Sequence, residues 1–207
     1  MPIRAPASTS AALGAVLAGG RGSRIGGAKA LVELDSRPLV GHAVAALREA
    51  GLEAVVVAKP GSELPPLACE VVRERPLPIH PIAGILTALD AARGRPIVAL
   101  ACDMPFVPPA LLAHLALLEA HVAVPMLDGR LEPGVARFEV SAAAALRRAL
   151  HREEPLREAI GSLDPAVVDE AELGRFGDPR RILLNVNTSG DLRLAEAGLQ
   201  PSERALP

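Results

Sequence analysis

Short apolar runs and amphipathic segments alternate along most of the chain. The runs at residues 13–17 and 97–102 are continuously apolar, which is typical of strands buried on both faces. Between them, apolar positions at residues 38–50 recur with helical spacing, with a proline in the first turn and a glycine just past the end. The pattern predicts strands and helices in alternation.

The other predicted elements follow the same order. Weaker apolar or β-branched runs predict strands at residues 54–58, 70–72, 122–124, 135–138 and 182–186. Helical spacing predicts helices at residues 82–92, 108–119 and 141–150. This order indicates the α/β class, a three-layer Rossmann-like fold with a mostly parallel central sheet and ligands at the carboxyl ends of its strands. We expect one domain over residues 1–207, with flexible tails at 1–11 and 198–207.

Composition favours a protein that binds small molecules. Half of the 207 residues are apolar, which is enough for one core. A net charge of −2 provides no field that would hold nucleic acid or an anionic membrane, and the absence of Trp and Tyr removes the usual base-stacking side chains. The N-terminus has no apolar run long enough for a signal core or a membrane span, which predicts a cytoplasmic protein.

A glycine-rich loop follows the first predicted strand. Between Gly19 and Lys29 the chain has five glycines, together with Arg21 and Arg24. Glycines let backbone N–H groups approach phosphate oxygens, and the cationic side chains supply charge. The loop is therefore predicted to bind a highly charged anion, with an ordinary glycine-rich turn and solvated arginines as the alternative.

Two common phosphate-binding motifs do not fit this loop. A Walker P-loop requires Gly-Lys-Ser/Thr, but Ala28 and Ala30 flank the loop lysine. A dinucleotide-binding fingerprint requires a third glycine where this chain has Ile25. The loop therefore matches neither of these two motifs.

Scarce residue types indicate further candidates. The chain has only two lysines, Lys29 and Lys59, and only two asparagines, Asn185 and Asn187. On the last predicted strand the asparagine side chains would share one face and offer two neutral oxygens. Asp103 follows a continuous apolar run and has the hard carboxylate oxygen that Mg²⁺ prefers. A surface lysine, a helix cap and a simple turn are the structural alternatives for these residues.

Five motifs occur along the chain: LAGGRGSRIGGAKALVEL from Leu17, HPIAGI from His80, ACDMPF from Ala101, LEPGVARF from Leu131 and LNVNTSGDL from Leu184. In this order they resemble the nucleotidyltransferases closest to molybdenum cofactor guanylyltransferase, and the resemblance covers about residues 13–197. That family usually has an acidic residue where this chain has Ala28 and an aspartate where it has Glu74. The LAGG and PIAG segments resemble the guanylyl branch, whereas cytidylyl relatives usually carry LAAG.

The resemblance implies roles for several of these residues. Asp103 and Asn187 are expected to hold Mg²⁺. Lys29 and Arg24 are expected to contact the triphosphate, and with Asp103 they form the predicted catalytic set. The predicted nucleotide-binding residues are Leu17, Ala18, Gly19, Gly20, Arg21, Gly22, Lys29, Glu74, Pro81, Gly84 and Asp103.

Two further predictions concern the base and the acceptor. Guanine needs a hydrogen-bond acceptor for its N1–H and N2 amino group, and Glu74 could supply it, although Arg73, Glu74 and Arg75 also have the pattern of a solvated charge cluster. Asn185 and Arg137 are predicted to contact the acceptor.

The predicted reaction is transfer of GMP from GTP to the terminal phosphate of molybdopterin, with release of pyrophosphate. The alternatives are cytidylyl transfer to molybdopterin or to another sugar or pterin phosphate, and a non-catalytic nucleotide-binding relative, which would suit the alanine at position 28. Besides GTP and molybdopterin, other proteins of molybdenum cofactor biosynthesis and acceptor molybdoenzymes are candidate partners. We expect a monomer that binds neither nucleic acid nor membrane.

Overall fold

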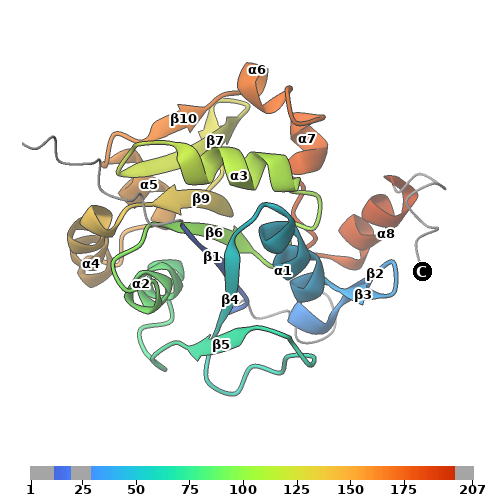
Figure 1. Cartoon of the computed structure of the whole chain (residues 1–207), viewed down its shortest axis with the longest axis horizontal. Coiled ribbons are helices and arrows are strands. Elements are labelled where there is room, and N and C mark those ends of the chain that lie inside the picture. The colour runs from blue at the N-terminus through green and yellow to red at the C-terminus, as the bar shows by residue number, and fades with distance from the viewer. Residues whose placement is uncertain (1–11, 20–28, 199–207) are drawn as a thin grey trace, which may run out of the picture.

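The apolar runs form one central sheet. The structure is a computed structural model that describes residues 12–19 and 29–198. The strands of this sheet are β1 (Leu13–Leu17), β4 (Glu53–Ala58), β5 (Glu70–Arg73), β6 (Ile97–Ala101), β7 (Val122–Leu127), β8 (Arg130–Leu131), β9 (Val135–Phe138) and β10 (Ala166–Val168). Their order is β10-β7-β9-β6-β1-β4-β5, with β8 paired to β7 (Figure 1).

Most of the sheet is parallel, as predicted. Strand β1 lies between β4 and β6, and β5 extends the sheet beyond β4, with every neighbour parallel. At the other end β10 pairs in parallel with β7. Strand β9 runs antiparallel between β6 and β7, and β8 pairs antiparallel with β7. The carboxyl ends of the parallel strands therefore share an edge with the amino end of β9.

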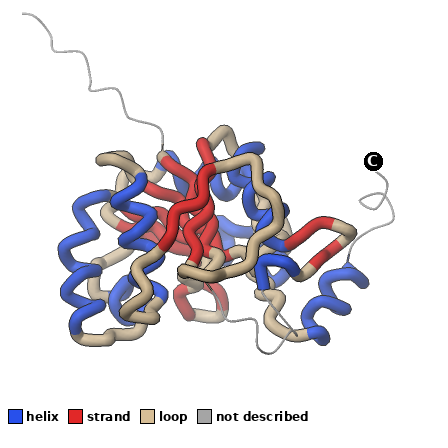
Figure 2. Tube along the Cα trace, turned by 90° about the horizontal axis from the view of Figure 1, so that it is seen from below, coloured by secondary structure: helices blue, strands red, loops and turns tan. Residues whose placement is uncertain are grey.

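Helices cover both faces of the sheet, which confirms the three-layer architecture (Figure 2). One face packs against α1 (Leu39–Glu49) and α3 (Pro109–Leu117). The opposite face packs against α2 (Pro81–Ala91), α4 (Ala143–His151) and α5 (Leu156–Gly161). Side chains of a strand alternate between the two layers, so Val16 packs with the α1 layer while Ala15 packs with the α2 layer.

The remaining elements surround the sheet. They are the hairpin of β2 (Glu33–Leu34) and β3 (Arg37–Pro38), the 3₁₀ turns Lys29–Leu31 and Val140–Ala142, and the helices α6 (Glu170–Leu173), α7 (Pro179–Ile182) and α8 (Ser189–Gly198). A small apolar cluster that includes Leu34, Val186 and Ala195 joins α8 to the hairpin. Within the described ranges no helix is long and apolar enough to cross a membrane. The predicted tails lie outside those ranges, except for Gly198, which ends α8.

The strand predicted at residues 182–186 is not formed. Pro179 starts a short helix instead, and the Asp178 carboxylate accepts the Arg180 N–H as its cap. The chain after Ile182 continues without a sheet partner, although Val186 is buried. The apolar pattern here reflects packing under α8 and the hairpin rather than strand pairing.

Candidate active site

A cavity of about 480 Å³ opens at the carboxyl ends of β1, β4 and β6. Its lining includes seven of the predicted site residues, which are Leu17, Gly19, Lys29, Glu74, Pro81, Gly84 and Asp103. Ligand sites of α/β proteins occur at this edge of the sheet, and a cavity of this volume can hold a nucleotide. Segments far apart in the sequence therefore line one cavity.

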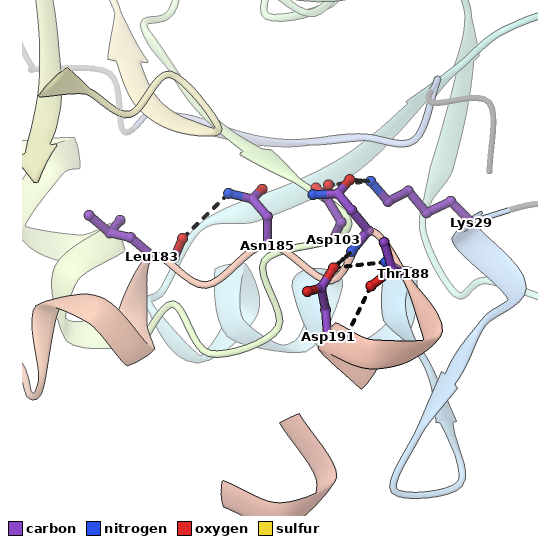
Figure 3. A network of polar contacts seen from close by, with 7 residues as sticks. Lys29, Asp103, Leu183, Asn185, Thr188 and Asp191 are labelled. Atoms are coloured by element: carbon purple, nitrogen blue, oxygen red, sulfur yellow. Dashed lines mark hydrogen bonds and ion pairs between the residues drawn. The ribbon is translucent and has the colours of Figure 1, made fainter. Parts of the chain in front are cut away.

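Lys29, Asp103 and Asn187 form a polar cluster, and the first two of these residues line the cavity. Figure 3 shows the Lys29 side chain directed at Asp103. The Lys29 Nζ lies 2.5 Å from Asp103 Oδ2 and 2.5 Å from Asn187 Oδ1. The Lys29 and Asp103 side chains are each only 13% exposed. A cation therefore already lies at the point toward which both oxygens are directed.

Backbone hydrogen bonds bring Asn187 beside Asp103. The Val186 N–H donates to the Asp103 carbonyl oxygen at 2.8 Å, which holds the two segments together immediately before Asn187. The Asp191 carboxylate then accepts the N–H groups of Asn187 and Thr188 at 2.9 and 2.8 Å. The Asp191 N–H donates to the Thr188 hydroxyl at 3.1 Å, which completes a reciprocal cap at the start of α8.

These hydrogen bonds also affect Asp191 electrostatically. The N–H of Asn187 is the main cause that lowers the pKa of Asp191, with smaller contributions from Thr188 and the positive charge of Lys29. Sequence reasoning did not select Asp191. The Thr188-x-x-Asp191 spacing of a capping box is the signal that could have identified it.

The oxygen donors of the cluster fit a magnesium ion. Asp103 supplies one carboxylate and Asn187 one amide oxygen, both directed at one point. Over residues 12–19 and 29–198 there is no group of three or more His, Cys, Asp and Glu side chains that could hold a metal. Mg²⁺ is commonly held by one or two carboxylates and completes its coordination with water and substrate phosphates.

Glu74 lies in the same cavity, next to two glycines. Glu74 is buried, with 7% of the residue exposed. A β-carbon on Gly19 would lie 2.7 Å from Glu74 Oε1, and one on Gly84 would lie 3.3 Å from it. Burial raises the pKa of Glu74, and the positive charge of Lys59 partly offsets that effect. Among the described residues, no side chain or backbone group donates a hydrogen bond to this carboxylate.

The other predicted site residues that the structure describes do not line the cavity. Ala18 is buried, and its N–H donates to the Val57 carbonyl, so it anchors the start of the glycine loop rather than lining the cavity. The Asn185 side-chain nitrogen donates to the Leu183 carbonyl at 3.4 Å, and its proposed contact with the acceptor stays a prediction. Four loop residues, Gly20, Arg21, Gly22 and Arg24, lie outside the described residues.

The structure corrects the prediction for Arg137. This residue pairs with Val98 near the start of β6, whereas Asp103 follows the end of β6. Arg137 is buried, with 5% of the residue exposed, and its guanidinium donates to the Ala120 carbonyl at 2.5 Å and to Glu139 at 2.7 Å. Because β9 is antiparallel, the end of the LEPGVARF motif lies away from the cavity, while Gly134 at its middle lines it.

Several lining residues were not predicted to belong to the site. Lys59, Pro133 and Gly134 line the cavity, and the scarcity of lysine was the signal available for Lys59. His80 also lines it, and its Nδ1 accepts the Ile82 N–H at 3.2 Å as the cap of α2. Burial raises the pKa of Cys102 to about 12, with a further contribution from Asp103. This thiol therefore stays protonated and does not act as a nucleophile.

The mostly parallel sheet, the glycine loop after β1 and the Lys29–Asp103 cluster define the class of the protein as a nucleotidyltransferase. The model of the MobA-like NTP transferase domain matches residues 14–167. The chain belongs to this family.

Individual relatives agree with this assignment. The molybdenum cofactor guanylyltransferase of Acidiphilium cryptum is 34% identical over 193 residues, which cover 88% of this chain and 93% of that protein. The crystal structure of molybdopterin-guanine dinucleotide biosynthesis protein A from Archaeoglobus fulgidus is 28% identical, with a TM-score of 0.75 over 89% of this chain and 96% of the other. The 2-C-methyl-D-erythritol 4-phosphate cytidylyltransferase from Thermus thermophilus shares the fold, with a TM-score of 0.66, 22% identity and coverage of 90% and 98%.

Proposed function

We propose that this nucleotidyltransferase transfers GMP from GTP to the phosphate of molybdopterin and requires Mg²⁺. The observation that carries the proposal is that one cavity of about 480 Å³ contains two kinds of group, a cluster suited to phosphates and a carboxylate suited to a base. The Lys29–Asp103–Asn187 cluster suits a triphosphate with its metal, and Glu74, which receives no hydrogen bond from the described residues, can accept from a base. The names of the relatives supply the acceptor.

Glu74 favours guanine over the other bases. Guanine has two adjacent donors, N1–H and the N2 amino group, and one carboxylate can accept from both. The carboxylate is buried, so leaving it without a donor is costly. Cytosine offers only its N4 amino group beside two acceptors, which would leave one carboxylate oxygen unpaired.

In the proposed reaction an oxygen of the acceptor phosphate attacks the α-phosphorus of GTP. A new phosphorus–oxygen bond forms, the bond between the α-phosphorus and the bridging oxygen breaks, and pyrophosphate leaves with the electron pair. Such a transfer depends mainly on positioning and on charge neutralisation. Lys29 would bind phosphate oxygens, while Asp103 and Asn187 would hold Mg²⁺, which when bound supplies further neutralisation of phosphate charge.

The direct test is pyrophosphate release from GTP with molybdopterin and Mg²⁺. We expect release that requires both substrates and is lost when the metal is chelated. The same assay with CTP is the matched comparison. Release with CTP but not GTP would overturn the assignment of guanine, and binding of GTP without any release would support a non-catalytic nucleotide-binding protein.

A thermal-shift comparison of GTP, CTP, UTP and ATP tests the base without the acceptor. A ligand at a hundred times its dissociation constant stabilises the fold by about 2.7 kcal/mol. For a domain of this size each 1 kcal/mol raises Tm by about 2–4 °C. GTP should therefore give the largest shift, and a larger shift with CTP would contradict the proposal.

A further inference from the structure

Lys59, the other lysine of the chain, lies where a base-reading group is needed. It directly follows β4 at the carboxyl edge of the sheet and lines the same cavity as Glu74. Its side chain lies over Gly19, because a β-carbon on that glycine would be 3.1 Å from Lys59 Cε and 3.4 Å from Lys59 Cγ. The lack of a side chain at Gly19 therefore leaves space for Lys59 beside the glycine loop.

The backbone of Lys59 is fixed while its ammonium remains available. Its carbonyl oxygen accepts hydrogen bonds from Arg73 Nη1 at 3.0 Å and from the Ser62 N–H at 3.1 Å. Across residues 12–19 and 29–198, its ammonium makes neither an ion pair nor a hydrogen bond. Glu74 is close enough for the charge of Lys59 to lower its pKa, but the two groups do not form a salt bridge.

The cavity thus contains an ammonium and a carboxylate that do not satisfy each other. Partly buried polar groups without partners are unfavourable, so a ligand with complementary groups would gain from both. The guanine edge has an acceptor, O6, next to two donors, N1–H and the N2 amino group. Adenine would instead direct its N6 amino group at the ammonium.

We propose that Lys59 determines specificity by donating to guanine O6 while Glu74 accepts from N1–H and N2. This inference rests on the proposed function, because it assumes that the cavity binds GTP. Lys59 and Glu74 then act as one recognition pair, and Lys29, which contacts Asp103 in the same cavity, serves the phosphates.

The test compares GTP with 6-thioguanosine triphosphate, measured by calorimetry with Mg²⁺ on the whole chain. The thio analogue keeps both donors of the base but replaces O6 with sulfur, a weaker acceptor. The wild-type protein should bind GTP about tenfold or more tightly than the analogue, which is the scale of one hydrogen bond to a charged group. The Lys59→Met variant should bind GTP more weakly than the wild-type protein does. Its dissociation constants for GTP and the thio analogue should differ by no more than about twofold.

Three further variants make the comparison specific. Lys59→Arg keeps a cationic donor and should retain a preference for GTP. Arg75 is exposed, follows Glu74 directly in the sequence and does not line this cavity. Arg75→Met removes its positive charge and should bind both nucleotides as the wild-type protein does. Lys59→Ala gives the same comparison if Lys59→Met does not fold, because it adds no bulk.

Two results would overturn the inference in different ways. If Lys59→Met weakens the binding of GTP and of the thio analogue equally, the ratio of the two affinities stays as in the wild-type protein. Lys59 then binds the ribose or the phosphates and does not contact O6. If the wild-type protein prefers another triphosphate to GTP, the proposed function itself fails. The inference is supported if Lys59→Met loses the preference for GTP over the thio analogue and Lys59→Arg keeps it.

Discussion

The side-chain nitrogen of Lys29 lies 2.5 Å from a carboxylate oxygen of Asp103, although 74 residues separate them in sequence. Asn187 directs its amide oxygen at the same nitrogen. The ammonium therefore occupies the position that these two oxygens would offer to a metal ion. In the proposed reaction, binding of a triphosphate with its metal would require Lys29 to exchange these oxygens for phosphate oxygens.

Replacing Lys29 by Met should have opposite effects on two ligands. GTP should bind about tenfold or more weakly, because a charged hydrogen-bond donor to phosphate is lost. Mn²⁺, used alone as a probe of the metal site, should bind more tightly because the ammonium no longer competes for Asp103 and Asn187. Calorimetry for GTP and electron paramagnetic resonance for Mn²⁺ would measure the two effects. Arg48→Met, a remote exposed substitution, is the control, and unchanged GTP affinity in Lys29→Met would remove this lysine from the site.

Asp103 and Asn187 should act as a unit in catalysis. Asp103→Asn keeps the size of the side chain but removes its charge, and turnover should fall by about a hundredfold or more. Adding Asn187→Ala to Asp103→Asn should reduce turnover by much less than Asn187→Ala does alone. Steady-state kinetics of the two single variants and the double variant would measure this coupling. Fully multiplicative losses would show that the residues have separate roles.

Asp191 should support the site through the backbone. Asp191→Ala removes the acceptor for the N–H groups of Asn187 and Thr188, and loss of a cap costs about 0.5–2 kcal/mol, here toward the lower end because the side chain is partly exposed. The lowered pKa of Asp191 means that its contribution is present above the ordinary value of 3.8 and is lost as the pH falls through the lowered value.

Urea unfolding of Asp191→Ala and the wild-type protein at several pH values would measure this difference. The variant should also bind Mn²⁺ more weakly, because Asn187 is no longer held beside Asp103. Asp191→Asn, which keeps one oxygen that can accept, should recover part of both losses. Equal Mn²⁺ affinity in Asp191→Ala and the wild-type protein would restrict this residue to capping α8.

Much of this architecture could be predicted from the sequence because burial leaves a strong pattern. Strands β1 and β9 match their apolar runs residue for residue, and Asp103 is located by the end of β6. Lys29, Asp103 and Asn187 were each selected from the sequence, but the contacts among them were not predicted. No local pattern shows that Val186 bonds to the Asp103 carbonyl, since that contact joins segments 83 residues apart.

Other features could not be predicted because tertiary packing decides them. The segment after Ile182 is apolar enough for a strand, yet it packs under α8 and finds no sheet partner. Arg137 was misplaced because the direction of β9 is not encoded in its own composition. Lys59 was visible as a rare residue, but only the position of Gly19 beside it shows that it lies in the cavity.

Glu74→Gln should stabilise the unliganded protein at neutral pH. The pKa of Glu74 is raised by burial, so the folded state favours the protonated form. Wild-type stability is then fully present below the ordinary value of 4.5 and declines as the pH rises through the raised pKa. The neutral glutamine avoids this decline, and each 1 kcal/mol gained would raise Tm by about 2–4 °C.

The advantage of Glu74→Gln should shrink as the pH is lowered from about 8 toward 5, as measured by thermal unfolding. Across this pH range the variant should bind GTP more weakly than the wild-type protein does. The reason is that an amide cannot accept from both guanine donors as a carboxylate does. Glu70→Gln is the matched control, since Glu70 is exposed at the start of β5, the strand that Glu74 directly follows. A variant that is no more stable than the wild-type protein at pH 8 would contradict this account of Glu74.

The reversed direction of β9 means that the two walls of the cavity can diversify independently. One wall is built on β1, β4 and β6, whose parallel pairing fixes Gly19, Lys59 and Asp103. The wall formed by the connection from β8 to β9 contains Gly134, which leads into β9 and accepts the Ala101 N–H through its carbonyl. Insertions between β8 and Gly134 would lengthen a surface connection without shifting the register of the parallel strands. The shape of this wall can therefore change while the strand ends that carry Gly19, Lys59 and Asp103 keep their places.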